Sequence, residues 1–194
     1  MGNREALLAG AKQSLLEKGY DRTTVRDITA AAGGVSMAAI GYHFGSRETL
    51  LTAALMEALE EWGAAVLIPA FANADPGAGG EDRYRRAWDD MIRTFTEQSP
   101  LWLASIEAFL QAQRSPELRA QLAGGQQEAR SGIAALVTGI DEQAVPDDVA
   151  RRIGSVQTAL ISGLMMQWLT DPERAPSSDD IVRGLRDLVA SLDQ

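Results

Sequence analysis

The stretch TTVRDITAAAGGVSMAAIGYHFGSRETLL, residues 23–51, predicts two short helices, a glycine turn between them and the start of a longer third helix. Thr24 can cap the first helix, because Asp27 three residues later completes a capping-box-like pattern. The pair Gly33-Gly34 can end this helix, since glycine accepts the left-handed backbone that a helix C-terminus often needs.

The same stretch contains the start and stop signals of the next two helices. Ser36 is the expected cap of a helix from Met37 to about Phe44. Gly45 should end that helix, and Ser46 should cap the third. Two short helices joined by a turn and followed by a third helix are the geometry of a helix-turn-helix DNA-binding motif.

Residues 4–51 resemble the N-terminal domain of the TetR family of bacterial regulators. The resemblance lies in the order, spacing and residue types of GYDRTTVRDI, VSMAAIGYHF and GSRETLL. It implies that the helix starting near Ser36 enters the major groove of DNA. The residues that the resemblance places at or near the DNA are Ser36, Met37, Ala38, Ala39, Gly41, Tyr42 and His43, and those near phosphates are Thr24, Arg26 and Arg47.

One feature departs from the family pattern. The family turn usually carries one glycine before the valine, whereas this chain carries Gly33 and Gly34 before Val35. The extra residue is expected to lengthen the turn and to shift the aim of the recognition helix. Within that helix, Ile40 and Phe44 are four residues apart and are expected to face the core.

The predicted recognition helix has few long polar side chains, so it offers few bidentate contacts to base edges. Ala38 and Ala39 could lie against thymine methyl groups, and Tyr42 and His43 could donate hydrogen bonds to phosphates. This composition favours binding through backbone contacts and apolar fit. The alternative for Tyr42 and His43 is packing within the protein.

The net charge of −9 is unevenly distributed along the chain. Residues 1–50 contain six Lys/Arg and five Asp/Glu, a balance of +1, and residues 51–194 contain twelve and twenty-two, a balance of −10. A balance of +1 is a weak electrostatic footprint for a DNA-binding domain. The alternative for Arg26 and Arg47 is that they are ordinary solvated charges, since many surface arginines contribute little. A helical ligand-binding or interaction protein with a non-functional DNA-binding domain is the alternative interpretation.

The rest of the chain has helical periodicity throughout and no persistent strand-like alternation. We expect an all-α fold of about nine helices, with a helix-turn-helix domain at residues 1–50 and a helical ligand-binding and dimerisation domain at residues 51–194. Pro69 should kink or end the helix begun at Ser46. NADPGAGG, residues 73–80, should form a loop.

The last two predicted helices are apolar on more than one side. One face can cover the protomer's own core, and a second copy of the chain is the usual cover for the other. The residues expected at this homodimer interface are Val149, Ile153, Val156, Leu160, Leu164, Trp168, Ile181, Leu185 and Leu188. The alternative is that both faces pack inside one chain. A two-fold dimer predicts a roughly palindromic operator in double-stranded DNA.

Large apolar residues of the middle region could line a pocket for a small-molecule effector, because such pockets are mostly apolar with a few polar groups. The candidate lining residues are Trp62, Tyr84, Trp88, Met91, Phe95, Trp102, Phe109 and Met166, and the candidate polar groups are Gln98, Glu107, Gln111, Gln157 and Gln167. The composition favours a bulky, mainly apolar effector of unknown identity. The alternative for each aromatic residue is plain core packing. The resemblance implies that effector binding releases DNA.

The content of reactive residues argues against an enzyme. The chain has no cysteine, and its single histidine, His43, lies in the predicted recognition helix. A disulfide framework, a cysteine–metal site, a Glu-x-x-His di-iron site and a nucleophilic triad are therefore not expected, nor is there a P-loop or dinucleotide fingerprint. We expect no catalytic residue, cofactor or metal. The polar N-terminus and the lack of about 18 consecutive apolar residues predict a cytoplasmic protein without a membrane partner.

Overall fold

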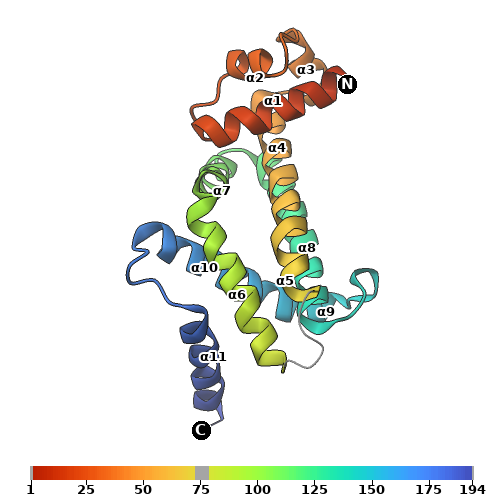
Figure 1. The fold of residues 1–194 in the computed structure, drawn as a ribbon. Helices are drawn as coiled ribbons and strands as arrows, with labels where there is room; N and C mark the ends of the chain where they lie inside the picture. The colour runs from red at the N-terminus through yellow and green to blue at the C-terminus, as the bar shows by residue number, and fades with distance from the viewer. Residues whose placement is uncertain (1, 73–78, 194) are drawn as a thin grey trace. The chain divides into compact units, whose positions relative to one another are not determined.

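The computed structural model describes residues 2–72 and 79–193, and within these ranges the fold is helical without strands. The elements are α1 (Asn3–Lys18), α2 (Val25–Ala31), α3 (Ala38–Phe44), α4 (Arg47–Trp62), η1 (Gly63–Leu67), α5 (Ile68–Ala72), α6 (Gly80–Glu97), α7 (Ser99–Ala112), α8 (Pro116–Thr138), η2 (Glu142–Ala144), α9 (Asp147–Val149), η3 (Ala150–Gly154), α10 (Ser155–Thr170) and α11 (Ser178–Leu192) (Figure 1). Segments α4–η1–α5 and α9–η3–α10 are each continuous. Apart from the short 3-10 turn η2, the described residues thus form nine helical segments, which confirms the all-α prediction.

The chain divides into two compact units. Unit 1 comprises residues 1–61 and 100–127, and unit 2 comprises residues 62–99 and 128–194. Packing therefore groups α7, except for its first residue, and the first half of α8 with the N-terminal helices. This division concerns compactness alone, and the functional boundary expected at residue 50 stays a prediction.

In unit 1, α1 packs closely against α2. Leu7, Ala11 and Leu15 of α1 and Ile28 of α2 are fully buried. Gly10 lies where the two backbones approach each other, because a Cβ atom there would be 2.7 Å from the Ala32 nitrogen and from the Ile28 oxygen. The crossing of α1 and α2 therefore depends on a residue without a side chain.

The turn after α2 is a Schellman motif, in which two amide groups return to the last carbonyls of the helix. The Gly33 N–H donates to the Ala30 carbonyl at 3.1 Å, and the Gly34 N–H donates to the Thr29 carbonyl at 2.8 Å. Gly33 and Gly34 have φ values of 78° and 84°, in the left-handed region that favours glycine. The first glycine thus closes the helix and the second extends the left-handed turn.

Pro69 does not end the helix that begins at Arg47, because helical structure continues to Ala72. The π-helical turn η1 directly precedes α5, which contains the proline. A π-helical turn inserts an extra residue into the helix, and helices commonly adjust in this way next to a proline that lacks an N–H. The predicted loop at residues 73–80 lies mostly outside the described residues, and α6 begins at Gly80.

In unit 2, α6 packs against α10 and α11. Trp88, Met91 and Phe95 of α6 are fully buried, and Ile161 of α10 and Ile181 of α11 face the same interior. None of the described helices is long and apolar enough to cross a membrane.

Candidate functional site

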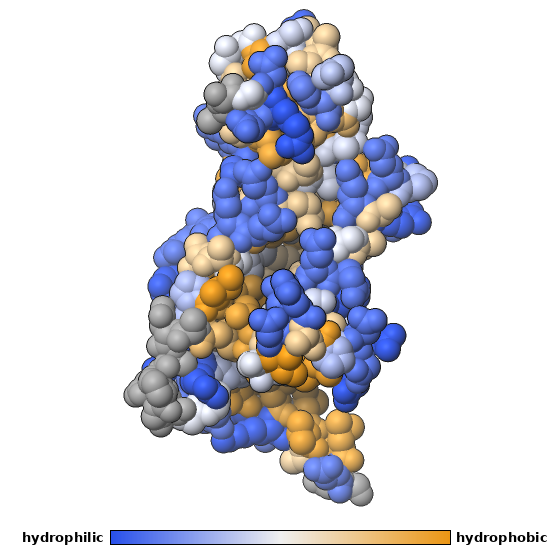
Figure 2. All heavy atoms as spheres, turned by 90° about the vertical axis from the view of Figure 1, so that its right-hand side faces the viewer, coloured by the Kyte–Doolittle hydropathy of each residue, from blue (hydrophilic) through white to orange (hydrophobic). Residues whose placement is uncertain are grey.

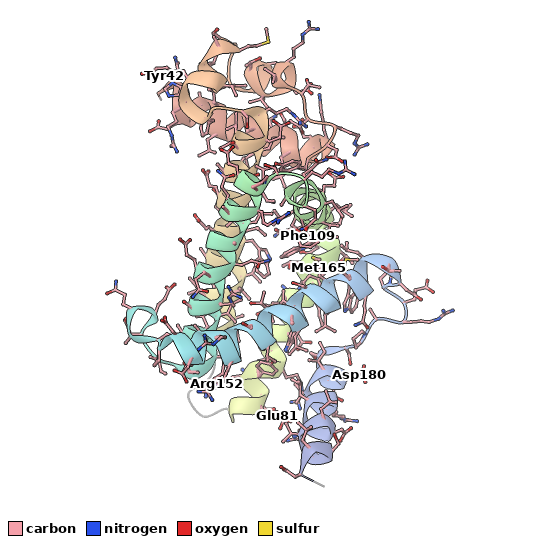
Figure 3. The ribbon with its side chains drawn as sticks, turned by 180° about the vertical axis from the view of Figure 1, so that it is seen from behind. Tyr42, Glu81, Phe109, Arg152, Met165 and Asp180 are labelled. Atoms are coloured by element: carbon pink, nitrogen blue, oxygen red, sulfur yellow. The ribbon has the colours of Figure 1, made fainter. Side chains whose placement is uncertain are left out.

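Helix α3 exposes most of its surface to solvent. Ile40 is its one buried residue, at 3% exposure, whereas Tyr42 is 86% exposed and Met37, just before the helix, is 56% exposed. Tyr42 projects away from the rest of unit 1 (Figure 3), and its ring meets the half-buried His43 edge-on. The remaining candidate residues around it, Thr24, Arg26, Ser36, Ala38 and Gly41, are also exposed, and Ala39 is half-buried.

The start and the core side of α3 differ slightly from the predictions. The helix begins at Ala38, one residue later than expected, and the Ser36 hydroxyl accepts the Ala38 N–H at 3.3 Å. Phe44 is half-buried, and the Arg4 guanidinium covers its ring at 5.2 Å from the centroid. A cation over a ring face is a favourable contact. Phe44 therefore joins α3 to α1 at the surface and not within the core.

The cations of the N-terminal region fall into two groups. Lys12, Lys18 and Arg47 form ion pairs with acidic residues of unit 1. The other three cations among residues 1–50, Arg4, Arg22 and Arg26, are exposed and form no ion pair with a described residue. These three are consequently the positive charges most available to DNA phosphates, and only Arg26 among them was predicted from the sequence.

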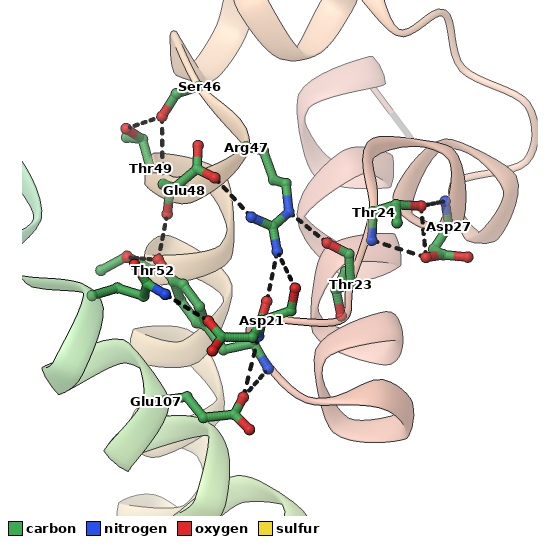
Figure 4. Close-up of polar contacts among 12 residues, drawn as sticks. Asp21, Thr23, Thr24, Asp27, Ser46, Arg47, Glu48, Thr49, Thr52 and Glu107 are labelled. Carbon is green, nitrogen blue, oxygen red and sulfur yellow. Dashed lines mark hydrogen bonds and ion pairs between the residues drawn. The ribbon is translucent and has the colours of Figure 1, made fainter.

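Arg47 is largely engaged within unit 1 (Figure 4). Its guanidinium donates to the carbonyls of Thr23 at 2.5 Å, Tyr20 at 2.7 Å and Asp21 at 3.1 Å, and pairs with Glu48 at 2.7 Å. These contacts within the protein explain the position of the Arg47 guanidinium without any contact to a DNA phosphate. Its side chain holds the turn between α1 and α2 against the start of α4.

The opposite side of this turn is held by Glu107 of α7. Its carboxylate accepts the backbone N–H groups of Tyr20 at 2.6 Å and Asp21 at 3.2 Å. Tyr20 is 1% exposed, and its hydroxyl donates to the Glu48 carbonyl at 3.0 Å and meets the Thr52 hydroxyl at 2.9 Å. Burial raises the pKa of this tyrosine. We call Tyr20, Asp21, Thr23, Arg47 and Glu107 the turn cluster.

The turn cluster was not predicted from the sequence. The one local sequence signal near it was Gly19. Gly19, which ends α1, has φ 87°, and a Cβ atom there would lie 3.1 Å from the Glu107 carboxylate. Glu107 and Gln111 were expected near an effector, but Gln111 also contacts the turn, since its amide donates to Asp21 at 2.8 Å. Both polar groups are therefore structural parts of unit 1.

The candidate pocket residues divide between the two units and differ in exposure. Trp62, Trp88, Met91 and Phe95 are buried in unit 2, and Trp102 is buried in unit 1. By contrast, Phe109 and Met166 are 53% and 47% exposed and face away from their own unit's core. Both lie on helices whose other face supplies the core, so their role as pocket residues stays a prediction.

A small polar cluster lies among the buried aromatic residues of unit 2. The Tyr84 hydroxyl donates to the Gln157 side-chain oxygen at 2.6 Å, between α6 and α10. Burial raises the pKa of Tyr84, and hydrogen bonds with Trp88 and Gln157 oppose that shift. Tyr84 also meets the Trp88 ring edge-on. We call Tyr84, Trp88 and Gln157 the α6–α10 cluster.

The candidate dimer residues do not all lie on an exposed face. Leu164 and Ile181 are each 7% exposed and pack inside the protomer, so their assignment to the interface is wrong. Val156 and Leu188 are 60% and 63% exposed. The remaining members, Val149, Ile153, Leu160, Trp168 and Leu185, are half-buried.

The geometry of α10 explains this mixture. Each step of four residues along a helix rotates about 40° around its axis, so a stripe built mainly on such steps drifts from one face to the next. The stripe from Val149 to Trp168 consequently follows the boundary between the buried and exposed faces. The exposed face of α10 carries Val156, Ala159, Gly163 and Met166.

A second exposed apolar segment lies at the end of α11. Leu188, Val189 and Leu192 are 63%, 61% and 85% exposed, and Figure 2 shows apolar surface beside the C-terminal end of the chain. The same helix is held to α6 by ion pairs that Arg85 forms with Asp179 and that Arg186 forms with Glu81. These contacts leave the apolar end of α11 uncovered within the protomer.

A shallow pocket of about 380 Å³ lies at the C-terminal end of α10. Its lining residues are Met166, Gln167, Thr170, Asp171, Arg174 and Ala175. Of the residues predicted to surround an effector, only Met166 and Gln167 contribute to it. The described residues contain no cluster of His, Asp and Glu suited to hold a metal ion.

Comparisons with known proteins agree with this architecture. The family model described as "Bacterial regulatory proteins, tetR family" matches residues 7–54, and that described as "Tetracyclin repressor-like, C-terminal domain" matches residues 79–192. No match is found among curated proteins.

Three solved structures share the fold over nearly the whole chain. A Rhodococcus sp. protein assigned to the TetR family of transcriptional regulators is 25% identical, with 97% of each chain covered and a TM-score of 0.61. The multidrug-binding protein EbrR in complex with proflavin is 23% identical, with 96% of this chain and 99% of that chain covered and a TM-score of 0.66. A Saccharomonospora viridis protein assigned as a transcriptional regulator, in complex with choline, is 24% identical, with coverage of 96% and 95% and a TM-score of 0.59. With both family models matching in order along the chain, this protein belongs to the TetR family of transcriptional regulators.

Proposed function

We propose that this regulator represses transcription by binding a roughly palindromic operator as a homodimer, and that a small, mainly apolar effector releases it from DNA. The main support for the DNA-binding part of this proposal is the exposure of α3, in which Ile40 is buried and Tyr42 is 86% exposed. A short helix that presents its polar and small residues to solvent suits the major groove.

The contacts that we propose with DNA are of two kinds. Ala38, Ala39 and Gly41 allow α3 to approach the base edges closely, while Tyr42 and His43 donate to phosphates. Arg4, Arg22 and Arg26 supply the electrostatic attraction. Because so few cations are available, we expect modest non-specific affinity.

The dimer that we propose uses the uncovered faces of the last two helices. Ala159 and Gly163 are small residues on the exposed side of α10, so a second helix can approach closely there. Leu188 and Leu192 of α11 supply apolar area that water would otherwise cover. Exposed apolar surface of this kind marks association sites, and a second copy forms a closed two-fold interface.

The effector is proposed to act by a population shift between two conformations of the dimer. Proflavin and choline occupy the structures of two relatives, which supports binding of small molecules by the helical domain. The helical segment from Arg47 to Ala72 leads from the helix-turn-helix into unit 2 and is the natural connection. An effector acts only if it prefers one conformation over the other.

The DNA-binding proposal is tested with the purified protein and a labelled fragment of the DNA upstream of its own gene. We expect specific binding that a scrambled competitor does not remove and that weakens as salt increases. Tyr42→Ala should lower the affinity about tenfold or more, which corresponds to about 1.4 kcal/mol. The matched control is Val137→Ala, an exposed apolar residue on α8 that should leave affinity unchanged. If no fragment of the genome is selected by the protein, the alternative of a ligand-binding protein without DNA-binding activity gains weight.

The dimer proposal is tested separately by light scattering coupled to size-exclusion chromatography. Leu188→Glu combined with Leu192→Glu should give monomers, because burial of two unpaired carboxylates in an apolar interface is unfavourable. Val137→Glu serves as the control and should remain dimeric. A double variant that elutes as a folded dimer would remove α11 from the interface.

A further inference from the structure

The pocket at the C-terminal end of α10 lies where the chain leaves this helix and turns toward α11 (Figure 1). Its volume of about 380 Å³ falls within the range of small-molecule sites, roughly 300–1,000 Å³. The last turn of α10 forms one side, and the loop that follows forms the other. All lining residues belong to unit 2, so the pocket is complete within one chain. We call it the α10-end pocket.

Two hydrogen bonds hold the loop against α10. The Ala175 N–H donates to the Asp171 carbonyl at 3.0 Å, which closes a single helical turn after the end of α10. The Trp168 indole N–H of α10 donates to the Pro176 carbonyl at 3.2 Å and ties the end of this turn back to the helix. The walls of the α10-end pocket are therefore fixed by contacts of the chain itself.

The lining of the α10-end pocket combines two opposite charges with apolar surface. Asp171 and Arg174 supply the charges, and Met166 and Ala175 supply most of the apolar groups. A simple cation or a simple anion would be attracted by one of these charges and repelled by the other. A molecule that carries both charges meets an opposite charge for each of them.

The two charged side chains are adjacent but loosely paired. The Arg174 guanidinium lies 3.4 Å from the Asp171 carboxylate, and the two side chains are 88% and 46% exposed. An exposed pair of this kind contributes little to stability. Neither side chain forms an ion pair with another described residue. Both charges are consequently available to a ligand.

The spacing of these charges determines which zwitterion fits. In an α-amino acid the ammonium and carboxylate groups are attached to one carbon atom, so they can face two protein charges that are themselves adjacent. Asp171 directly follows α10, where the carbonyl end of the helix dipole adds to the negative charge and favours the ammonium group. The carboxylate then meets Arg174, whose planar guanidinium suits a carboxylate.

We infer that the α10-end pocket binds a free α-amino acid with an apolar side chain. Its ammonium group pairs with Asp171, its carboxylate pairs with Arg174, and its side chain lies against Met166 and Ala175. A methionine thioether is flexible and polarisable, so it adapts to apolar and aromatic groups of different shapes. This inference goes beyond the proposed function, because it adds a second kind of ligand at a surface site of unit 2.

The test uses L-phenylalanine as the probe, together with two analogues that each lack one charge. 2-Phenylethylamine lacks the carboxylate, and 3-phenylpropionate lacks the ammonium group. All three are titrated into the full-length protein labelled with 13C at the methionine methyl groups, in the absence of DNA. Met166→Leu and Met91→Leu assign the two resonances. We expect L-phenylalanine to move the Met166 methyl resonance and to leave that of buried Met91 unchanged. Each analogue should bind about three- to fivefold more weakly, the loss expected for one exposed ion pair.

Two variants identify which protein charge binds which ligand group. Asp171→Asn should weaken binding of L-phenylalanine and 2-phenylethylamine about three- to fivefold without weakening that of 3-phenylpropionate. Arg174→Gln should weaken binding of L-phenylalanine and 3-phenylpropionate by a similar factor without weakening that of 2-phenylethylamine. The matched control is Asp89→Asn, an exposed acid of α6 that should leave all three affinities unchanged. Circular dichroism verifies that the variants keep the fold.

Three results would overturn the inference: equal affinity for the three compounds, an unmoved Met166 methyl resonance in a saturated L-phenylalanine solution, or the same effect of Asp171→Asn and Arg174→Gln on both analogues. Binding confined to the double variant Leu188→Glu/Leu192→Glu would also overturn it, because a second copy would then cover the pocket in the dimer. Since no DNA is present, failure of operator binding would contradict the proposed function without affecting this outcome.

Discussion

The two polar clusters of this protein differ in how completely their groups are paired. In the turn cluster of unit 1, Arg47 binds the carbonyls of residues 20, 21 and 23, and Glu107 binds the N–H groups of residues 20 and 21. In the α6–α10 cluster of unit 2, the Tyr84 hydroxyl donates to the Gln157 side-chain oxygen and also interacts with the Trp88 indole, while the Gln157 amide NH2 has no acceptor among the described residues.

This difference predicts how much each cluster contributes to stability. A fully paired network in a region of low dielectric constant holds one geometry, because the loss of either partner leaves the other unsatisfied. A cluster that leaves a buried donor without an acceptor contributes less to stability, because that donor has lost its contact with water. We accordingly expect substitutions in the turn cluster to lower the free energy of unfolding by more than substitutions in the α6–α10 cluster do.

The largest effect should come from Arg47→Ala. It leaves three backbone carbonyls without their donor, and hydrogen bonds to charged groups contribute about 1.5–3 kcal/mol each when isolated. Since the side chain is partly exposed and water can replace some contacts, we expect a total loss of about 3 kcal/mol. Urea unfolding followed by circular dichroism measures it. Arg47→Lys, which keeps the charge but not the planar geometry, should recover only part. A loss below about 1 kcal/mol for Arg47→Ala would mean that the turn cluster does not hold the turn.

Gly10→Ala should have the next largest effect on the free energy of unfolding. The sign of this effect shows whether α1 and α2 approach each other closely. Alanine in a helix interior is normally more stable than glycine by about 1 kcal/mol. At Gly10, however, the new methyl group would lie 2.7 Å from backbone atoms of Ile28 and Ala32, which cannot move without separating α1 from α2. We expect a net loss of about 2 kcal/mol, as for overpacking.

The matched control for this prediction is Gly124→Ala. Gly124 lies inside α8, is exposed and has open space around its Cα atom. Substitution there should increase the free energy of unfolding by up to about 1 kcal/mol. If both variants are stabilised, the approach of α1 and α2 is looser than the structure indicates.

The two regions also differ in how far their sequence predicts their structure. In the helix-turn-helix, Thr24, Gly33, Gly45 and Ser46 act at the positions expected from local rules, since caps and left-handed turns depend on near neighbours. The TetR resemblance, which rests on this region, is confirmed by the family models. The role of Arg47 was missed because its partners lie 24 to 27 residues away.

In unit 2, periodicity predicted the helices but not which face is covered. Met166 and Leu164 are both apolar residues of α10, yet one is 47% exposed and the other 7%. An apolar residue on a two-sided helix gives no local indication of its partner, because the partner is chosen by tertiary packing. The role of Gln157 could not be predicted for the same reason, since Tyr84 is 73 residues away.

The double variant Tyr84→Phe/Gln157→Leu should change stability little, within about 1 kcal/mol of the unmodified chain. Replacing both partners of a buried hydrogen bond by apolar residues of similar shape often leaves stability nearly unchanged. The double variant also removes the unpaired amide NH2 of Gln157. Urea unfolding under the conditions used for Arg47→Ala gives a direct comparison of the two clusters. A loss as large as that of Arg47→Ala would mean that the α6–α10 cluster is structural and would abolish the contrast.

The smallest effects should come from two capping-box acids, Asp27 in unit 1 and Asp180 in unit 2. Hydrogen bonds from Lys18 and Thr24 hold the pKa of Asp27 well below its ordinary value, whereas Ser177 is the main cause of the lowered pKa of Asp180. Lowered folded-state pKa values contribute stability that is present above the unfolded pKa, about 3.9, and is lost as pH falls through the folded value.

We therefore expect Asp27→Asn to lower the unfolding midpoint at pH 7 by more than Asp180→Asn does, because only Asp27 has a direct ion pair, at 2.5 Å from Lys18. The decrease in unfolding midpoint caused by each substitution should be constant above about pH 5. It should become smaller below about pH 4, where the carboxylates of the unmodified chain become protonated and stop contributing stability. Because Lys18 is exposed and Asp27 is half-buried at the surface, added salt should screen their ion pair and reduce the loss of stability in Asp27→Asn. Thermal unfolding of the two variants across pH 3–7 at low and high salt measures these trends. A deficit of Asp27→Asn that salt leaves unchanged would mean that the Thr24 cap, and not the Lys18 ion pair, stabilises the start of α2, and the two capping boxes would then be equivalent.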